Sequence, residues 1–250
     1  ESALALAGGV SLHLHPYGFI TFSKASMLSP RGICNVFDAS GDGYVRSEGG
    51  GMFLLKDYDR ALTDGDHILA VVAASAVNTD GRKSGLTVPS SRAQAALLQE
   101  AYELAGIEPA EIDYIEAHGT GTAVGDPIET LALGEAIGLR RPAGKPLPIG
   151  SVKSNVGHLE AASGVAGLVK ALHCLQYREI PATIHLEHPN PKILFGEWNL
   201  RVVQERMPLK ASGRLVIGVN SFGFGGANAH VVLTTPPAAG SRRLRHQAGR

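Results

Sequence analysis

The sequence is short of cysteine, of net charge and of long apolar runs. Its two cysteines, Cys34 and Cys174, are far apart and form no CxxC pair, which excludes a disulfide scaffold and a cysteine zinc site. Since 23 basic residues balance 23 acidic ones, no nucleic-acid or anionic-membrane surface is indicated. No apolar run approaches the roughly 20 residues of a membrane span, and the first residues lack signal-peptide features. We therefore expect a soluble protein of the cytoplasm.

Three kinds of motif-like segment, five segments in all, do not support a directly bound metal or dinucleotide. Residues 38–43 resemble the start of a calcium loop, but Gly49 occupies its twelfth position and the following segment is typical of a strand. The glycine pairs at 119–121 and 223–225 lack the third glycine of GxGxxG. The histidine pairs at 13 and 15 and at 185 and 188 lack acidic or thiol companions at metal spacing.

Apolar, β-rich runs alternate with helical patterns, which predicts an α/β fold with strands buried on both faces. Strands are expected at residues 68–77, 112–117, 147–152, 215–221 and 230–235. Ser90 or Ser91 can cap a helix that ends at Gly106, with a buried face that includes Leu97 and Leu104. A further helix is expected at 158–177, rich in small residues that allow close packing on a sheet.

The segment Asp126-Pro-Ile-Glu129 has the pattern of a helix start. Aspartate is a favoured N-cap, proline suits the first helical position, and glutamate three residues on completes a capping box. We expect this helix to end at Gly138.

The two ends of the sequence differ in character. The first ten residues enter an apolar, strand-like run without an initiating methionine, so we expect the chain to begin within a domain. Residues 236–250 lose apolar periodicity and gain Pro, Gly and Arg, which predicts a linker or a disordered tail.

Two histidines follow predicted strands, and in α/β proteins the catalytic and binding residues commonly lie at the carboxyl ends of strands. His118 lies in a Gly/Thr turn directly after a strand, and His158 lies at the start of a predicted helix. The partial positive charge of a helix N-terminus disfavours imidazolium at His158, and nearby Lys153 acts in the same direction. A neutral imidazole can donate a hydrogen bond to a thioester carbonyl as it becomes an enolate. Taken alone, each histidine also fits an ordinary core or surface role.

Three segments occur in a fixed order: HGTGTAVGDPIETLAL from residue 118, GSVKSNVGHLEAASGVAGL from 150 and GVNSFGFGGANAHVVL from 218. Together they resemble the motif blocks of β-ketoacyl synthases. Upstream, FDASGDGYVRSEGGG and AVNTDGRKSGLTVPS resemble the same family, especially ketosynthase domains of bacterial type I polyketide synthases. The resemblance covers residues 2–235.

The resemblance implies a thiolase-like fold of layered αβαβα type. Residues 1–235 would then be a ketosynthase domain without its N-terminal part. Residues 1–66 would end the N-terminal half, 67–235 would form the C-terminal half, and 236–250 would be the tail. Because half of such a core exposes an apolar interface, we expect the isolated chain to be unstable or to aggregate.

The implied activity is decarboxylative Claisen condensation of an acyl thioester with a malonyl-type extender, in polyketide or fatty-acid biosynthesis. The substrates are carried on the phosphopantetheine of acyl carrier protein, and the full-length protein is expected to be a homodimer.

By position, His118 and His158 match the family's paired catalytic histidines, Lys153 its site lysine, and Glu129 an acidic residue near that lysine. Glu129 is equally consistent with a role confined to the Asp126 capping box.

Thr120 and Thr122 match threonines that hydrogen-bond the phosphopantetheine arm, although both also suit a turn. Phe224 lies in a glycine loop that, in the family, supplies a backbone N–H to the oxyanion hole and gates the acyl pocket. A tight strand connection is the alternative role of this loop. The neighbouring residues expected to bind substrate are Phe222, Gly225 and Gly226.

The family's nucleophilic cysteine normally lies in a small-residue elbow upstream of the segment that matches ALALAGGVSL. Cys34 and Cys174 lack such an elbow, and we expect both to be buried. A truncated sequence and a naturally divided protein both account for this, and we favour truncation. A ketosynthase-like domain that binds carrier-bound chains, or only decarboxylates malonyl units, is the alternative function.

Overall fold

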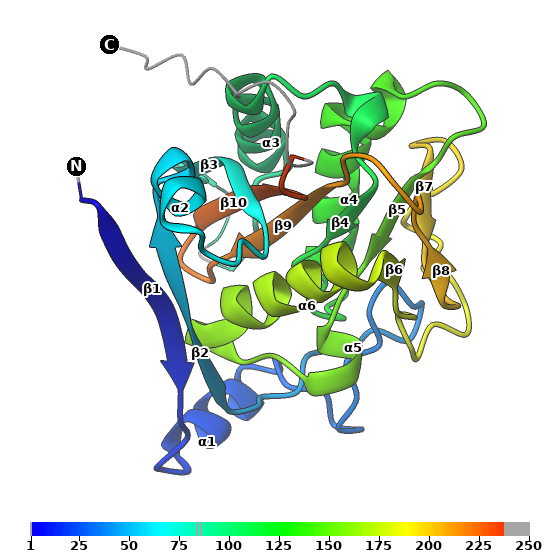
Figure 1. Ribbon diagram of the computed structural model, residues 1–250. Coiled ribbons are helices and arrows are strands. Elements are labelled where there is room, and N and C mark those ends of the chain that lie inside the picture. The colour runs from blue at the N-terminus through cyan, green and yellow to red at the C-terminus, as the bar shows by residue number, and fades with distance from the viewer. Residues whose placement is uncertain (1, 84, 86, 238–250) are drawn as a thin grey trace.

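The computed structural model describes residues 2–83, 85 and 87–237, so the predicted tail lies outside the described residues from position 238 onward. A six-stranded mixed sheet lies at its centre, in the order β3-β10-β9-β4-β5-β7 (Figure 1). The strands are β3 (Val71–Thr79), β4 (Tyr114–Glu116), β5 (Leu147–Gly150), β7 (Leu200–Val202), β9 (Val216–Phe222) and β10 (Ala227–Thr234). All five sequence-predicted strands are confirmed within this sheet.

Strand direction decides which loops meet. β9, β4, β5 and β7 pair in parallel, whereas β10 is antiparallel to both of its neighbours. β4 and β5 are buried along their whole length, as expected for parallel strands covered on both faces. Since parallel strands end at the same edge, the segments that follow β4, β5 and β9 converge there.

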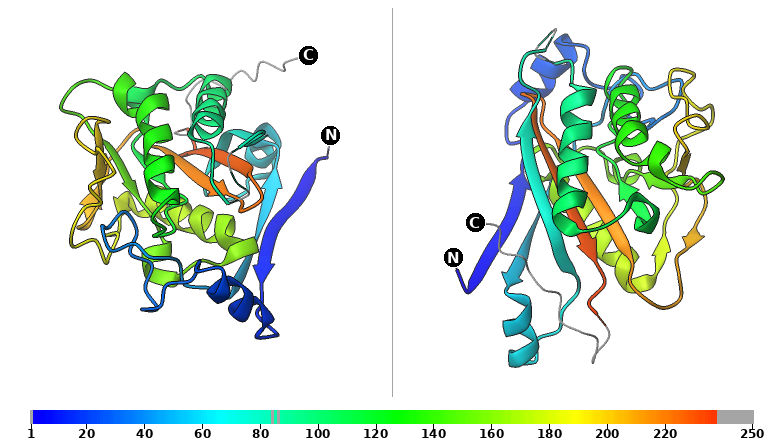
Figure 2. Two further views of the ribbon diagram at one scale, coloured as in Figure 1. Left: turned by 180° about the vertical axis from the view of Figure 1, so that it is seen from behind. Right: turned by 90° about the horizontal axis from the view of Figure 1, so that it is seen from above.

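Helices cover both faces of the sheet. α6 (Ser163–Tyr177) packs on the face seen in Figure 1. α3 (Ser91–Ala105) and α4 (Gly125–Ala136) pack on the opposite face, which the rear view in Figure 2 presents. Adjacent strand residues point to different layers, so Tyr114 joins the core beneath α6 while Ile115 joins the core beneath α3 and α4. The described chain is therefore a helix–sheet–helix sandwich.

Helix α3 forms as predicted at both ends. The Ser90 side chain accepts a hydrogen bond from the Ala93 N–H at 3.2 Å, and Gly106 ends the helix in the left-handed conformation. The predicted buried face was only partly right: Leu97 is fully buried, but Leu104 is 65% exposed. The buried stripe is turned toward α4, because the helix packs on α4 as well as on the sheet.

The predicted helix at 158–177 begins later than expected. Residues Lys153–Val156 form the short helix α5, which Gly157 ends with φ of +75°. A 3-10 turn, Glu160–Ala162, precedes α6, which starts at Ser163. His158 lies in an extended bridge to Arg46 between these elements. It is therefore outside every helix.

The remaining elements lie around the sandwich. They are α1 (Tyr17–Lys24), α2 (Tyr58–Asp64), the strand pair β6 (Glu179–Ile180) and β8 (Met207–Pro208), and the 3-10 turns Pro109–Glu111 and Gly138–Arg140. Among the described residues, no helix is long and apolar enough to cross a membrane.

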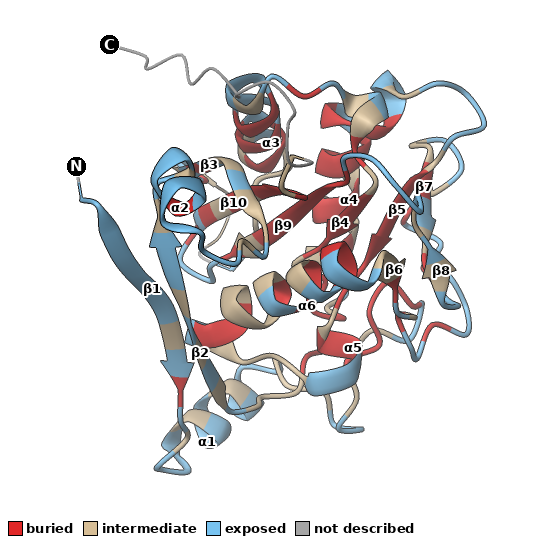
Figure 3. Ribbon diagram, viewed as in Figure 1, coloured by how far each residue is buried: buried red, intermediate tan, exposed pale blue. Residues whose placement is uncertain are grey.

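β1 (Leu4–Ser11) and β2 (Gly49–Lys56) form a separate antiparallel ribbon beside α6. In Figure 3 this ribbon is coloured mostly as exposed. Leu6 faces Leu54 across the ribbon, and these side chains are 69% and 63% exposed. Paired apolar side chains on a two-stranded ribbon form a surface that favours association.

We predict that the purified chain self-associates through this ribbon. Leu6→Lys with Leu54→Glu should increase the monomer fraction measured by size-exclusion chromatography with light scattering, because the pair becomes charged and complementary. Leu104→Lys with Leu139→Glu, at positions 65% and 59% exposed on other elements, is the control and should change it little. A parent chain that is already monomeric, or equal gains from both double variants, would contradict the prediction.

Candidate active site

The loop after β4 is held by two carboxylates from the first turns of α4. The backbone N–H groups of His118 and Gly119 donate to Glu129 at 2.7 and 2.8 Å. Those of Thr120 and Gly121 donate to Asp126 at 3.0 and 3.2 Å. The predicted capping box is therefore wrong: α4 begins at Gly125 without a side-chain cap, because both carboxylates are turned toward the neighbouring loop.

Glu129 also connects this loop to β9. The Asn220 side-chain amide donates to Glu129 at 2.8 Å, and Asn220 Oδ1 lies 2.6 Å from Nδ1 of His230. Asn220 and His230 are buried and were not predicted from the sequence as site residues. A signal was present, because both are polar residues inside apolar strand segments, where buried polar groups need partners.

The ring of His118 has a defined tautomer when neutral. Its Nδ1 accepts the Phe222 backbone N–H at 3.3 Å, so the ring proton lies on Nε2. The Phe222 ring packs on it with centroids 5.7 Å apart. Burial lowers the pKa of His118 well below its usual value, and the charges of Lys153 and His158 act in the same direction.

His158 is oriented in the same way. Its Nδ1 accepts the backbone N–H of Glu160 at 2.9 Å, which leaves the proton on Nε2. Burial lowers its pKa to about 3, with a further contribution from the Lys153 charge. The predicted Lys153 effect is thus present, but the predicted helix-dipole effect is not. His158 follows the C-terminal end of α5, where a dipole would favour imidazolium.

The structure brings the two histidine rings together. Their centroids are 5.4 Å apart and the rings are nearly perpendicular, at 83°. Two neutral rings, each with its proton on Nε2, provide two N–H donors that need no proton loss or gain to act. Such a preorganised pair suits stabilisation of one developing oxyanion.

Lys153 links β5 to the His118 loop. Its side chain is buried, and Nζ donates to the main-chain oxygen of His118 at 2.6 Å. Burial lowers the pKa of Lys153, while the negative charges of Glu116 and Glu129 oppose that shift. The predicted proximity of Glu129 to this lysine is consistent with that charge interaction.

Glu116 fixes the backbone that carries Lys153. One carboxylate oxygen accepts the Val152 N–H at 2.5 Å, and the other lies 2.7 Å from Nζ of Lys170 on α6. The Tyr114 hydroxyl donates to the same oxygen as Lys170, also at 2.7 Å. From the sequence, Glu116 was predicted only to lie within a strand, and no local motif indicates this partner on a distant helix.

The glycine loop between β9 and β10 is a tight connection. The Gly223 N–H donates to Ala227 O at 2.6 Å, and the Gly226 N–H donates to Gly223 O at 2.9 Å. Gly226 has φ of +96°, which a side chain would strain. Phe224 is 49% exposed, and its ring packs against that of Phe22 in a T-shaped arrangement with centroids 6.1 Å apart. Gly225 has open space where a Cβ would lie.

The two threonines lie next to each other. Their hydroxyl oxygens are 3.1 Å apart, and that of Thr122 accepts the Gly125 N–H at 3.1 Å. Thr120 is buried and Thr122 is half-buried. Both residues thus stabilise the turn before α4, whatever else they bind.

Neither cysteine has the properties of a nucleophile. Cys34 and Cys174 are buried, as predicted. Burial raises the pKa of both thiols, that of Cys174 to about 12. At neutral pH both are protonated, and a thiol is a poor nucleophile.

The central sheet, its helical layers and the two adjacent histidines form an α/β fold with a polar site at one edge of the sheet, and comparison with known families shows its family. Residues 69–187 match the family model described as "Beta-ketoacyl synthase, C-terminal domain", and residues 1–61 match "Beta-ketoacyl synthase, N-terminal domain". Residues 189–248 match "Ketoacyl-synthetase C-terminal extension". The chain belongs to the β-ketoacyl synthase family.

Its relatives are polyketide synthases and their ketosynthase domains. The chain is 51% identical over 231 residues to a phenolphthiocerol/phthiocerol polyketide synthase of Mycobacterium tuberculosis, covering 92% of this chain and 12% of that protein. The ketosynthase from module 6 of the bacillaene synthase from Bacillus subtilis 168 superposes with a TM-score of 0.90 at 40% identity, over 94% of this chain and 42% of that one. The oxazolomycin ketosynthase domain from Streptomyces albus JA3453 also gives 0.90, at 41% identity, over 94% and 41%. The fold is thiolase-like, and the chain spans less than half of each of these two solved ketosynthases.

We predict that Glu129→Gln lowers the free energy of unfolding by about 2 kcal/mol, since an amide N–H₂ would face backbone donors that now meet a carboxylate. Chemical denaturation measures this change. Glu135→Gln, at an exposed position of the same helix, should stay within about 0.5 kcal/mol of the parent. Equal effects of the two substitutions would rule out the anchoring role of Glu129.

A second prediction concerns pH. Burial lowers the pKa of His230 to about 3, so between about pH 6.5 and pH 3 the unfolded state binds a proton that the folded state does not. The contribution of the neutral His230 ring to the free energy of unfolding is therefore complete above pH 6.5 and is lost as the pH falls. Asp126, whose pKa burial raises to about 7, acts in the opposite direction, so only a difference between variants isolates the histidine.

The stability difference between the parent and His230→Gln should therefore shrink on acidification, by up to about 1.4 kcal/mol per pH unit. Urea unfolding from pH 7 to pH 5 measures it. The same measurement on His67→Gln, at an exposed position, is the control. A constant difference for His230→Gln would show that this ring titrates alike in both states.

Proposed function

We propose that this chain forms the histidine-bearing part of a ketosynthase of the acyltransferase class. The reaction is decarboxylative condensation of an acyl thioester with a malonyl-type extender. One observation carries the proposal: the rings of His118 and His158 lie 5.4 Å apart, and each accepts a backbone N–H on Nδ1. Both therefore present an Nε2–H donor.

The proposed reaction uses these donors at the extender thioester. When the malonyl carboxylate leaves as CO₂, the electrons of the broken C–C bond pass to the thioester carbonyl and form an enolate. The two Nε2–H groups stabilise its oxyanion by hydrogen bonds without transferring a proton. The enolate carbon then attacks the acyl carbonyl, and a thiolate departs to leave a β-ketoacyl thioester. Lys153 positions His118 through its main-chain oxygen.

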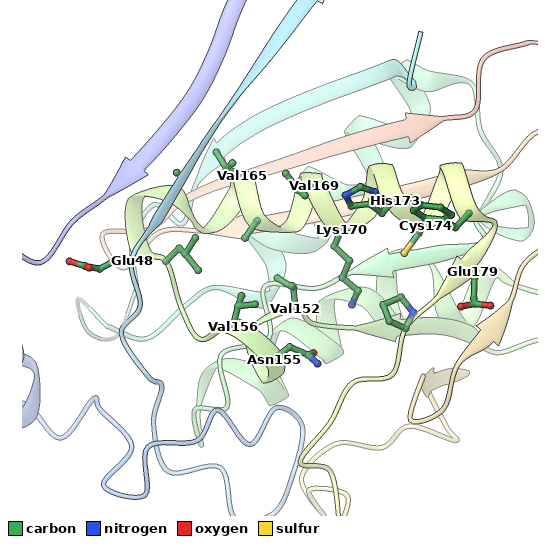
Figure 4. Close-up of a pocket in the computed structure, with 15 residues that line it drawn as sticks. Glu48, Val152, Asn155, Val156, Val165, Val169, Lys170, His173, Cys174 and Glu179 are labelled. Atoms are coloured by element: carbon green, nitrogen blue, oxygen red, sulfur yellow. The ribbon is translucent and has the colours of Figure 1, made fainter. Parts of the chain in front are cut away.

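The acylated thiol would come from an N-terminal ketosynthase half, because both thiols of this chain are buried and protonated at neutral pH. A groove beside α6 offers a surface for that half. It is lined mainly by apolar side chains, including Val156, Val165 and Val169 (Figure 4). The solved ketosynthases contain more than half of their length beyond the part that matches this chain, which supports a docking half of that origin.

Further parts of the proposal follow from family membership. Acyl carrier protein would present the extender on phosphopantetheine, with Thr120 and Thr122 near its arm. The loop with Phe222, Phe224, Gly225 and Gly226 would bind the acyl chain and supply an oxyanion N–H, supported by the contact of Phe222 with His118.

The division at residues 66 and 67 is supported by the change of matching family model between residues 61 and 69. A homodimer in the cytoplasm completes the proposal. The two unpaired cysteines support a reducing compartment.

The test combines the chain with the N-terminal half of a related ketosynthase that carries its cysteine. With an acyl donor and malonyl-loaded carrier protein, ketide formation is followed by mass spectrometry. His118→Ala and His158→Ala should each reduce the rate on the order of 100- to 1000-fold, because one oxyanion donor is lost. His67→Ala, at an exposed position, should have no effect.

Two outcomes would overturn the proposal. Unchanged ketide formation in either histidine variant removes that residue from the mechanism. Release of CO₂ without ketide, when an active cysteine is present, favours the alternative of a domain that only decarboxylates malonyl units.

A further inference from the structure

Glu160 has an unusual backbone conformation next to the site. Its φ is +46°, in the left-handed region that residues with a Cβ seldom adopt. Left-handed residues other than glycine persist only where surrounding contacts hold them, and they cluster at functional sites. The N–H of this same residue donates to His158 Nδ1 at 2.9 Å.

Arg46 holds Glu160 in place. Its guanidinium makes a two-point contact with the Glu160 carboxylate, at 2.6 Å from Nε and 2.7 Å from Nη2. The Arg46 side chain is only 8% exposed, and the rings of Phe19 and Phe22 cover it at 4.8 and 5.2 Å. A paired, shielded and bidentate contact of this kind fixes orientation more strongly than a surface ion pair.

The same segment holds His158 through its backbone. The His158 N–H donates to Val45 O at 2.7 Å, and the Ser47 N–H donates to His158 O at 3.0 Å. The Tyr44 ring lies against the imidazole, with centroids 5.0 Å apart. The Tyr44 hydroxyl donates to Glu160 at 3.3 Å. Residues 44–47 thus contact both the histidine and the residue that supplies its hydrogen bond.

We infer that Arg46 is a positioning residue for His158. By holding the Glu160 carboxylate, it keeps the Glu160 N–H directed at Nδ1 and so fixes the proton of the ring on Nε2. Without Arg46, Glu160 relaxes toward an ordinary backbone conformation, its N–H turns away, and Nδ1 competes for the proton. The importance of this fixed tautomer for the reaction rests on the proposed function, in which the Nε2–H of His158 donates a hydrogen bond to the oxyanion.

The experiment reads the tautomer directly, in the full 250-residue chain labelled with ¹⁵N-histidine. The parent should show widely separated ¹⁵N shifts for Nδ1 and Nε2 of His158. In Arg46→Met, which keeps an apolar stem, that separation should narrow. Arg46→Lys keeps the charge but not the two-point contact and should give an intermediate value. The shifts of His118, which is held by Phe222 instead, should stay constant and report an intact fold.

Arg31→Met is the matched control, because it breaks an exposed arginine–carboxylate pair with Asp42, and it should leave His158 unchanged. If Arg46→Met does not fold, Glu160→Gln, which weakens the same contact, decides the question by the same narrowing. An unchanged His158 separation in the folded variant overturns the inference.

Activity supplies a separate readout. In the complex with the N-terminal half, Arg46→Met should slow condensation about 10- to 100-fold, since a misdirected donor costs rate without being removed. The tautomer is measured without substrate. If the parent complex never condenses but the ¹⁵N separation of His158 narrows in Arg46→Met, only the proposed function is contradicted. If the parent complex condenses but the separation does not narrow in Arg46→Met, only this inference is contradicted.

Discussion

The site depends on one buried carboxylate, that of Glu129. It accepts three N–H groups, two from the loop after β4 and one from Asn220 on β9. A buried carboxylate is costly unless its oxygens are hydrogen-bonded. Helix α4, the loop after β4 and strand β9 are therefore stable only in the arrangement that supplies these donors. The position of His118 follows from that requirement, as does the link to Phe222 at the end of β9. Helix α4 therefore acts as the anchor of the histidine loop.

Burial also sets the protonation states around this anchor. It disfavours charge on His118 and His158, and the cation at Lys153 acts in the same direction. Both rings are neutral at physiological pH and keep a donor N–H. The same desolvation raises the pKa of Cys34 and Cys174, which removes them as nucleophiles. One physical effect thus prepares the hydrogen-bond donors of the site and excludes this chain's own thiols from its chemistry.

Sequence patterns predicted those features whose cause is local. The strands, the Ser90 cap and the Gly106 end of α3 were right, because alternation, capping and left-handed glycine depend on neighbouring residues. The Asp126 capping box was wrong, since the carboxylates found donors on another loop. The helix start at His158 was also wrong, because the chain there pairs with the segment around Arg46. Local patterns contain no information about such distant partners.

The sequence by itself determined the α/β class, the family resemblance and the identity of His118, His158 and Lys153 as candidates, because ordered motifs and periodicity are properties of the chain. Only the tertiary structure decided that the two imidazoles lie next to each other, nearly perpendicular, and that each has its proton on Nε2. It also decided that Glu129, Asn220 and Arg46 hold the segments around them. Apart from the hydrogen bond from Glu160 to His158, these facts depend on contacts between residues well separated in sequence. Several of those contacts form where the sheet brings the carboxyl ends of β4, β5 and β9 to one edge.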